Sequence, residues 1–289
     1  MKGMSGLNMI KRILCLLLCL SFFASGIVYA EKNEEDDEQR ELQEAYFNEL
    51  GINTEFMNYP EVSRGLCVAV ILQLIGADVQ PMDENKLFDD VDENTEYGDE
   101  IYTGASMGIV SGNGGNFRPQ DNAELLEAQV MLMNVLGYSH IVNSNGGFPM
   151  GYISLGNGTK LLSGVNGSYD EKLSGAQLAK MIYNALTCEV IEFYRDGSKD
   201  GYRTVSGHDL LWTYRRVAKA EGIATAANGA SLTDPTRFVK DNIIEINGVS
   251  YIYDGSNTDV LGKHIVGYVS RDDTDQLKYV IPYRNDVLT

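Results

Sequence analysis

The chain has 289 residues, of which 41 are acidic and 23 are basic, and its formal net charge is −18 at pH 7. A negative surplus of this size disfavours binding to nucleic acid and to anionic membranes, because both carry negative charge themselves. The length suits one or two domains.

Residues 1–30 have the pattern of a signal peptide. A basic start precedes the apolar run ILCLLLCLSFF, and small residues stand at Val28 and Ala30, where a signal peptidase reads. The apolar run is shorter than the roughly 20 residues that span a bilayer. Cleavage is therefore favoured over an uncleaved membrane anchor, and no membrane span is expected in the mature chain. Removal of this segment leaves 20 basic residues against 41 acidic ones, a net charge of −21.

Two cysteines, Cys67 and Cys188, belong to the expected mature chain. An exported protein can join such a pair in a disulfide. Both, however, lie in apolar helical patterns, where a buried free thiol is the commoner state. Free thiols are favoured, and a disulfide remains the alternative.

After an acidic lead-in at 31–40, apolar residues recur at four-residue spacing. Val62, Leu66, Val70 and Leu74 predict a largely buried helix that starts near Ser63. The same order of a short helix, a glycine-containing loop, a turn and a longer apolar helix then returns twice, at offsets of about 50 to 60 residues.

These units span 41–80, 85–140 and 147–190. One helix pair cannot bury its apolar faces alone, whereas three pairs can do so around a shared axis. The sequence therefore predicts a mainly α module of three helix pairs in a pseudo-threefold arrangement.

The composition changes after Cys188. A polar, turn-rich linker is expected at 191–211, and β-rich segments follow at 212–289. Asn247-Gly248 is a strong two-residue hairpin signal, and the segment SRDDTDQL predicts a second hairpin tip. Several short strands within about 75 residues predict a small all-β barrel or sandwich, so the chain is α+β overall.

No cofactor, metal or catalytic site is expected. The glycine-rich segment 108–122 lacks both the phosphate-loop pattern and the dinucleotide fingerprint. His140, His208 and His264 are far apart, and neither H-x-x-x-H nor C-x-x-C spacing occurs. Two acidic loops, which start at Asp90 and Asp196, lack calcium-site positions and are better interpreted as polar turns. A hydrolase site in the β-rich part is a third hypothesis that no motif supports.

The second unit carries a recognisable set of residues, which are Phe88, Asp90, Val91, Ile101, Gly108, Ile109, Val110, Gly112, Phe117, Pro119, Leu136 and Gly137. In these residues it resembles the S-layer homology (SLH) family, and the first and third units resemble that family less closely. The resemblance implies an exported protein of the bacterial cell wall or surface. It further implies a three-pronged module that binds secondary cell-wall polysaccharide, often with anionic or pyruvylated sugars.

The resemblance also gives the glycines a structural role. Gly108 and Gly112 are expected to turn the chain with positive φ where a helix ends. Pro119 is expected to set up the next helix, with Asp121 or Asn122 as its cap.

A Thr-Arg-Ala-Glu-like motif at the start of each second helix carries much of the family's binding. Here it reads Ser63-Arg64-Gly65-Leu66, then Glu124-Leu125-Leu126-Glu127, then Ser174-Gly175-Ala176-Gln177. The candidate polysaccharide-binding residues are therefore Ser63, Arg64, Glu127, Ser174 and Gln177. Ser63 and Ser174 are also expected to act as N-caps.

Arg64 is the only motif arginine, and its guanidinium offers a fork of donors to an anionic sugar. At best one binding groove out of three is expected. The alternative is an SLH-fold scaffold or protein-interaction module that has lost polysaccharide binding and contacts other surface proteins.

Overall fold

The structure is a computed structural model of the chain. It describes residues 37–83, 86–197, 199–256 and 259–287. The expected signal peptide lies outside the described residues, as does most of the acidic lead-in.

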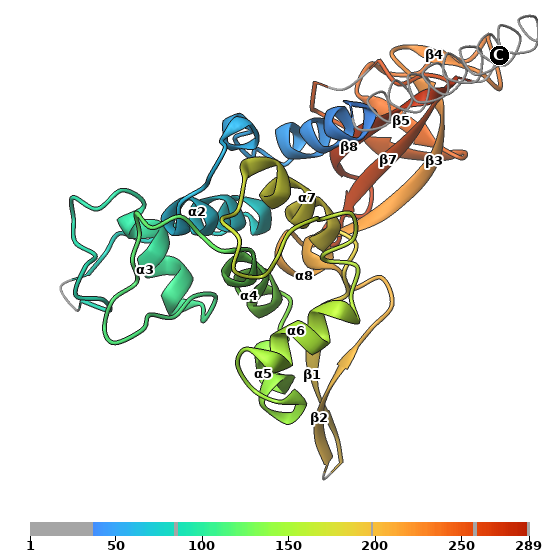
Figure 1. Cartoon of the computed structure of the whole chain (residues 1–289). Helices are drawn as coiled ribbons and strands as arrows, with labels where there is room; N and C mark the ends of the chain where they lie inside the picture. Colours follow the sequence, from blue (N-terminus) through green and yellow to red (C-terminus); the bar gives the residue numbers. More distant parts are fainter. Residues whose placement is uncertain (1–36, 84–85, 198, 257–258, 288–289) are drawn as a thin grey trace, which may run out of the picture. The chain divides into compact units, whose positions relative to one another are not determined.

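Contacts divide the chain into two compact units, Met1–Glu44 and Ala45–Thr289. The described residues of the first unit, 37–44, are helical. The second unit starts with helical residues 45–49 and is α+β, with helices first and a curled antiparallel sheet after them (Figure 1).

The helices of the second unit are short. They are η1 (Glu55–Asn58), α2 (Arg64–Ile75), α3 (Gly98–Ser106), α4 (Leu125–Val135), α5 (Ser139–Val142), η2 (Asn143–Asn145), α6 (Met150–Asn157), α7 (Gly175–Ala185) and α8 (Leu210–Tyr214). As the four-residue spacing predicts, α2 is buried along most of its length, and it ends at Gly76 in the left-handed conformation (φ 64°). Gly104 of α3 faces α2, because a Cβ there would lie 2.8 Å from the Val68 side chain.

Helices α2, α4 and α7 start from a closed ring of backbone hydrogen bonds. The residue two before each helix takes part: Val62 N donates to Leu173 O (3.0 Å), Leu173 N to Ala123 O (2.8 Å), and Ala123 N to Val62 O (2.9 Å). All three residues are fully buried. We call these three residues the N-cap ring. It brings together three helix starts that are far apart in the sequence.

The capping residues follow the ring directly. Ser63 Oγ accepts the Leu66 N–H (3.1 Å), and Ser174 Oγ accepts the Gln177 N–H (3.3 Å), which confirms both serines as N-caps. The cap of α4 is Glu124 rather than Asp121 or Asn122. The expectation was wrong because Ala123 pairs in the ring, so the helix starts later.

The turn that precedes α4 uses glycine in two ways. Gly108 has a φ of 73° just after α3. Gly112 is not among the positive-φ residues, contrary to the expectation. It is small for another reason, because a Cβ would lie 2.7 Å from Asn116 O and 2.8 Å from the Phe88 ring.

The segment expected as a linker, 191–211, instead contains a hairpin. Strands β1 (Ile191–Asp196) and β2 (Lys199–Thr204) pair antiparallel. The rings of Phe193 and Tyr202 pack edge to face with 5.7 Å between their centres. Arg195 forms two hydrogen bonds with Asp200 (2.8 and 3.1 Å). The charged residues between the aromatic ones made this segment look like a polar linker.

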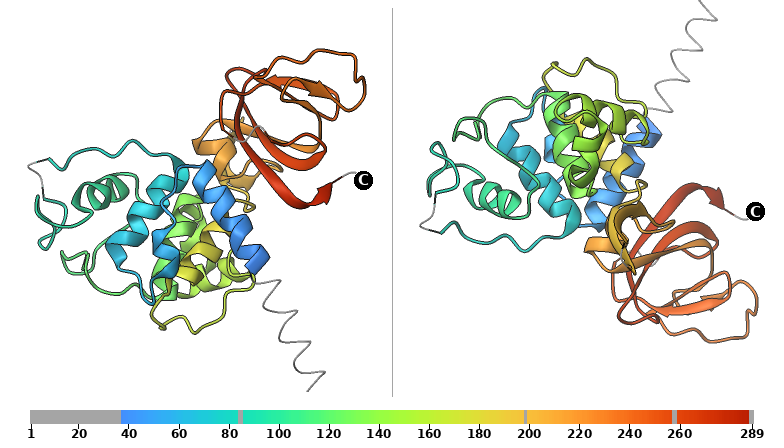
Figure 2. Two further views of the ribbon diagram at one scale, coloured as in Figure 1. Left: turned by 90° about the horizontal axis from the view of Figure 1, so that it is seen from above. Right: turned by 90° about the horizontal axis from the view of Figure 1, so that it is seen from below.

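The remaining strands form one antiparallel sheet in the order β6-β5-β3-β7-β8, with β4 paired to β3. They are β3 (Val217–Ala227), β4 (Ala230–Ser231), β5 (Ile243–Ile246), β6 (Val249–Ile252), β7 (Lys263–Ser270) and β8 (Leu277–Val287). The β5–β6 turn is Asn247-Gly248, both with positive φ, as its sequence predicts. The described strands curl into a half-barrel rather than a closed barrel or a sandwich (Figure 2). An isolated bridge joins Ile252 to Gln276.

The β-rich part of this unit has an apolar core. The sheet closes over a buried cluster that includes Ile244, Tyr253 and Ile265.

Cys67 and Cys188 are free and buried, so no disulfide joins them. Burial raises the pKa of the Cys67 thiol to about 12, which keeps it protonated and unreactive.

Candidate functional site

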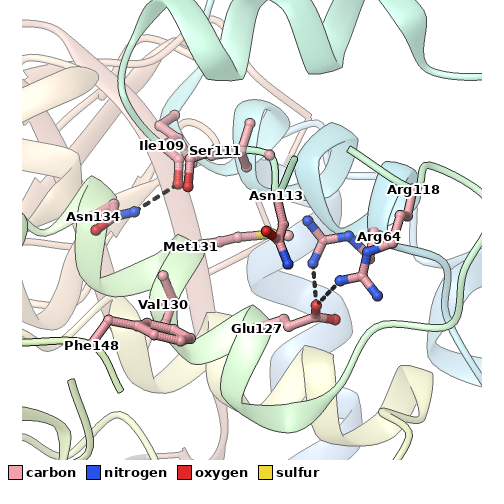
Figure 3. Close-up of a pocket in the computed structure, with 12 residues that line it drawn as sticks. Arg64, Ile109, Ser111, Asn113, Arg118, Glu127, Val130, Met131, Asn134 and Phe148 are labelled. Carbon is pink, nitrogen blue, oxygen red and sulfur yellow. Dashed lines mark hydrogen bonds and ion pairs between the residues drawn. The ribbon is translucent and has the colours of Figure 1, made fainter. Parts of the chain in front are cut away.

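A pocket of about 410 Å³ lies between the start of α2 and one side of α4. Its walls come from the first residue of α2, from the loop 109–113, from Arg118, from one side of α4 and from Phe148. We call it the α2–α4 pocket. Figure 3 shows a charged end around Glu127 and, farther along the same side of α4, an apolar end at Val130 and Phe148.

Arg64 reaches the charged end from a buried position. Its residue is only 6% exposed, its Nε donates to Phe117 O (2.8 Å), and its guanidinium lies 4.6 Å from the centre of the Phe117 ring. Burial lowers the pKa of the guanidinium from its ordinary value, and the carboxylate of Glu127 opposes that shift. The group remains charged, because an arginine keeps its proton in proteins.

Arg118 comes from the loop before α4 and is held by Asp90. One oxygen of Asp90 accepts the Phe117 N–H (2.8 Å), and the other accepts the Arg118 N–H (2.7 Å). These two bonds fix Arg118 in the left-handed region (φ 64°), which is uncommon for a residue with a long side chain. Asp90 therefore fixes the backbone of Arg118 and, with it, the position from which the Arg118 side chain extends into the pocket.

Glu127 joins the two arginines. Its Oε1 lies 2.5 Å from Arg64 Nη1 and 2.6 Å from Arg118 Nη2, and its Oε2 accepts the Glu124 N–H (3.0 Å). Asp121 lies 3.4 Å from Arg118 at an exposed position. The two acids offset the two positive charges, so the pocket offers oriented guanidinium donors rather than a large excess of charge.

The predicted site residues separate into two places. Arg64 and Glu127, from different helices, meet in the pocket. Ser63 lies at the start of α2 with its hydroxyl bonded to Leu66 N. Ser174 and Gln177 lie at the start of α7 and do not line the pocket.

A second hollow lies beside the start of α7, and we call it the α7 hollow. It is lined by Gly164, Val165, Asn166, Gly167, Glu171, Ala176, Gln177 and Lys180. Gln177 is already engaged there: its Oε1 accepts from Ser174 N (2.8 Å) and Ser174 Oγ (2.9 Å), and its Nε2 donates to Asn166 O (2.7 Å). Its amide therefore stabilises the helix start.

Steric contact explains why glycine stands at the motif's arginine position in α7. A Cβ on Gly175 would lie 1.7 Å from Phe56 O, in η1. No side chain fits there unless η1 moves, so an arginine is excluded at this helix start. The corresponding residue of α4 is Leu125, which is 3% exposed.

The first backbone N–H groups of α2 and α4 are not free to bind an anion. A helix start attracts anions through unpaired N–H groups. The described bonds pair them with loop carbonyls: Arg64 N to Asp121 O (2.9 Å), Gly65 N to Pro119 O (3.0 Å), Leu125 N to Glu171 O (3.0 Å), Leu126 N to Tyr169 O (3.0 Å) and Gly175 N to Tyr59 O (2.9 Å). Recognition of an anion in the α2–α4 pocket therefore depends on side chains.

Arg118 and Phe148 are among the pocket residues that the sequence did not single out. Arg118 lies outside the motif, and only its position between Phe117 and Pro119 hinted at an unusual backbone. Phe148 precedes α6 in a stretch without a recognised pattern. Arg118 is held by Asp90, 28 positions away. Phe148 contacts Tyr152, whose hydroxyl bonds to Asn134, 18 positions away. A local pattern does not carry that information.

The described residues hold no group of three or more His, Cys, Asp or Glu side chains that could bind a metal ion. Within the same residues, no single helix has both the length and the apolar character to cross a membrane. One pair, Leu125–Val135 and Ser139–Asn145, meets that test only when joined across a bend of 107°.

Comparison with known families gives one match. The model for the S-layer homology domain matches residues 87–124, which include α3, Asp90 and Arg118. A search of curated proteins finds no matching sequence. SLH domains are non-catalytic anchoring domains that generally bind cell-wall polysaccharide. The match implies association with the cell surface or cell wall and suggests an anchoring role for this part of the chain.

Proposed function

We propose that residues 41–80, 85–140 and 147–190 are three SLH repeats around a pseudo-threefold axis. In this proposal they hold an exported protein non-covalently on secondary cell-wall polysaccharide at the bacterial surface, with the signal peptide 1–30 removed. The β-rich part, 212–289, is the portion that the anchor displays, and no catalytic step is assigned to it.

The N-cap ring supports the three-repeat arrangement. Val62, Ala123 and Leu173 stand in the same place relative to α2, α4 and α7, and each donates one bond and accepts one. A closed ring of this kind is what a threefold assembly of similar units would contain. The family match, residues 87–124, lies within the second unit, and the ring extends the argument to the other two.

The observation that carries the binding proposal is the pair of arginines in the α2–α4 pocket. A guanidinium matches the geometry of a carboxylate or phosphate oxygen pair. Arg64 and Arg118 are held in place by Glu127, Phe117 O and Asp90, so little side-chain freedom is lost on binding. We propose that these two arginines contact an acidic group of the polysaccharide and that Glu127 positions them.

The other predicted site residues have smaller parts in this proposal. Ser63 and Ser174 cap helices, and Gln177 completes the cap of α7. One working groove is therefore proposed, beside α2 and α4.

One specific observation favours the alternative, an SLH-fold scaffold without glycan binding. Glu127 and Asp121 already pair with the arginines, so an acidic ligand must compete with them. The scaffold would then contact surface proteins instead.

A sedimentation experiment separates the two. The mature chain is mixed with purified sacculi that carry their secondary polysaccharide, and with sacculi from which it has been stripped. Anchoring predicts pelleting with the intact sacculi alone, and weaker pelleting for Arg64→Ala than for changes at Leu125 or Gly175 among variants that remain folded. Pelleting that ignores stripping, or no pelleting at all, contradicts the proposal.

A further inference from the structure

We propose that Phe148 is an aromatic platform for a sugar ring, so that the α2–α4 pocket selects an acidic sugar rather than an acid or a neutral sugar alone. This inference rests on the proposed function of the same pocket, and it adds a residue outside the arginine cluster by which the pocket distinguishes an acidic sugar from a small acid. Phe148 lies outside the residues 87–124 that match the SLH model.

The pocket has two chemically different ends. Arg64 and Arg118 occupy one, and Val130 and Phe148 occupy the other, farther along the same side of α4 (Figure 3). Small-ligand pockets are mostly apolar with a few placed polar groups that fix orientation, and about 410 Å³ lies within their usual range. A ligand that fills this pocket therefore needs an anionic group at one end and an apolar face at the other.

Phe148 is exposed and yet braced. Its residue is 72% exposed, and its ring meets the Tyr152 ring edge-on at 6.4 Å. The Tyr152 hydroxyl donates to Asn134 Oδ1 (2.6 Å), and Asn134 Nδ2 donates to Ile109 O (2.9 Å). This chain of contacts ties the ring to the opposite wall of the pocket.

A single exposed apolar residue needs no explanation by itself. Phe238, which is 81% exposed, lines neither the α2–α4 pocket nor the α7 hollow. Phe148 differs because it forms part of the wall of a pocket whose other end holds a charged cluster. An exposed phenyl face at that place is suited to the C–H face of a sugar.

The ligand class follows from the two ends together. A small anion such as acetate can use the arginines but not the platform. A neutral glycoside can cover the platform but leaves the arginines with Glu127. A uronic acid or another acidic sugar uses both, since its carboxylate and its ring face are a few bonds apart.

The test uses NMR titrations of the mature chain with three probes: D-glucuronate, acetate and methyl α-D-glucoside. The variants are Phe148→Ala and Phe148→Trp, with Phe238→Ala as the matched control for loss of an exposed phenyl ring. The wild type is expected to bind glucuronate about tenfold more tightly than either other probe. Phe148→Ala should remove that advantage and leave acetate binding unchanged, whereas Phe148→Trp and Phe238→Ala should keep it.

The outcomes separate this inference from the proposed function. If the wild type pellets with intact sacculi but Phe148→Ala binds glucuronate and sacculi as Phe238→Ala does, anchoring survives and the platform is wrong. If sacculi are not bound but the glucuronate preference depends on Phe148, the platform stands and anchoring is wrong. If the wild type shows no preference for glucuronate over acetate, the platform is also wrong.

Discussion

At the starts of both α4 and α7, a side chain three residues beyond the cap accepts the backbone N–H of the capping residue. Glu127 Oε2 does so for Glu124 N at 3.0 Å, and Gln177 Oε1 does so for Ser174 N at 2.8 Å. The two side chains differ in what their second polar atom contacts. The second oxygen of Glu127 meets two arginines, whereas the amide nitrogen of Gln177 bonds to the carbonyl of Asn166.

The neighbouring helix explains this difference. Arg64, at the start of α2, reaches Glu127. Gly167 lies beside both Gln177 and Leu125: a Cβ on Gly167 would be 3.1 Å from Gln177 Nε2 and 3.4 Å from the Leu125 side chain. The side chain that α4 places near Gln177 is therefore that of Leu125. A similar helix start thus becomes a polar site when its neighbour supplies an arginine, and a closed structural cap when its neighbour supplies a leucine.

The largest effect on stability is expected at Gly175, the position at the start of α7 where the motif arginine is excluded. Gly175→Ala places a methyl group against Phe56 O, 1.7 Å away. Because that atom belongs to the backbone of η1, the helix must shift, and a loss of about 3 kcal/mol or more in the free energy of unfolding is expected. Denaturant titration followed by circular dichroism measures it.

Gly65→Ala is the matched control for this prediction. Its Cβ would lie 3.1 Å from a ring carbon of Tyr97 and 3.2 Å from Pro119 O. Small adjustments relieve such contacts, so a loss of about 1 kcal/mol or less is expected. Equal losses for the two variants would contradict the steric account of the missing arginine.

The next effect concerns the arginine that is present. Arg64→Ala removes the ion pair with Glu127, the bond to Phe117 O and the packing on the Phe117 ring. Glu127 keeps Arg118 as a partner, so the expected loss is about 2–3 kcal/mol, below that of a fully buried pair. Arg195→Ala, in an exposed ion pair of the β1–β2 hairpin, is the control and should leave the unfolding curve unchanged.

A smaller effect is expected at Asp90. Asp90→Ala removes the acceptor of two backbone N–H groups that hold Arg118 in its left-handed conformation. The expected loss is about 1–2 kcal/mol, together with weaker binding of glucuronate, because Arg118 no longer starts from a fixed place. Asp89→Ala changes the neighbouring carboxylate and should keep glucuronate binding. If it weakens binding as much as Asp90→Ala does, Asp90 has no special positioning role.

Local patterns predicted the local parts of this structure well. The spacing of Val62, Val70 and Leu74 predicted a buried helix, Ser63 and Ser174 predicted caps, and Asn247-Gly248 predicted a hairpin. These features depend on neighbouring residues, and their physical causes can be found within a few positions of the chain.

For the site, the sequence predicted individual residues but not the contacts between them, because those contacts join distant parts of the chain. Arg64 and Glu127 were both singled out, but their contact joins two helices and no repeat of residues indicates it. The exclusion at Gly175 depends on a carbonyl 119 positions away, at Phe56. The left-handed Arg118 depends on Asp90.

The most direct test of the central claim compares Arg118→Ala with Lys180→Ala in sedimentation with intact sacculi. Arg118 lines the α2–α4 pocket, and Lys180 lines the α7 hollow. If the pocket is the binding site, Arg118→Ala lowers the affinity for sacculi by about tenfold or more, whereas Lys180→Ala binds as the wild type does. Equal losses, or a larger loss for Lys180→Ala, would contradict the claim that binding occurs at the pocket beside α2 and α4.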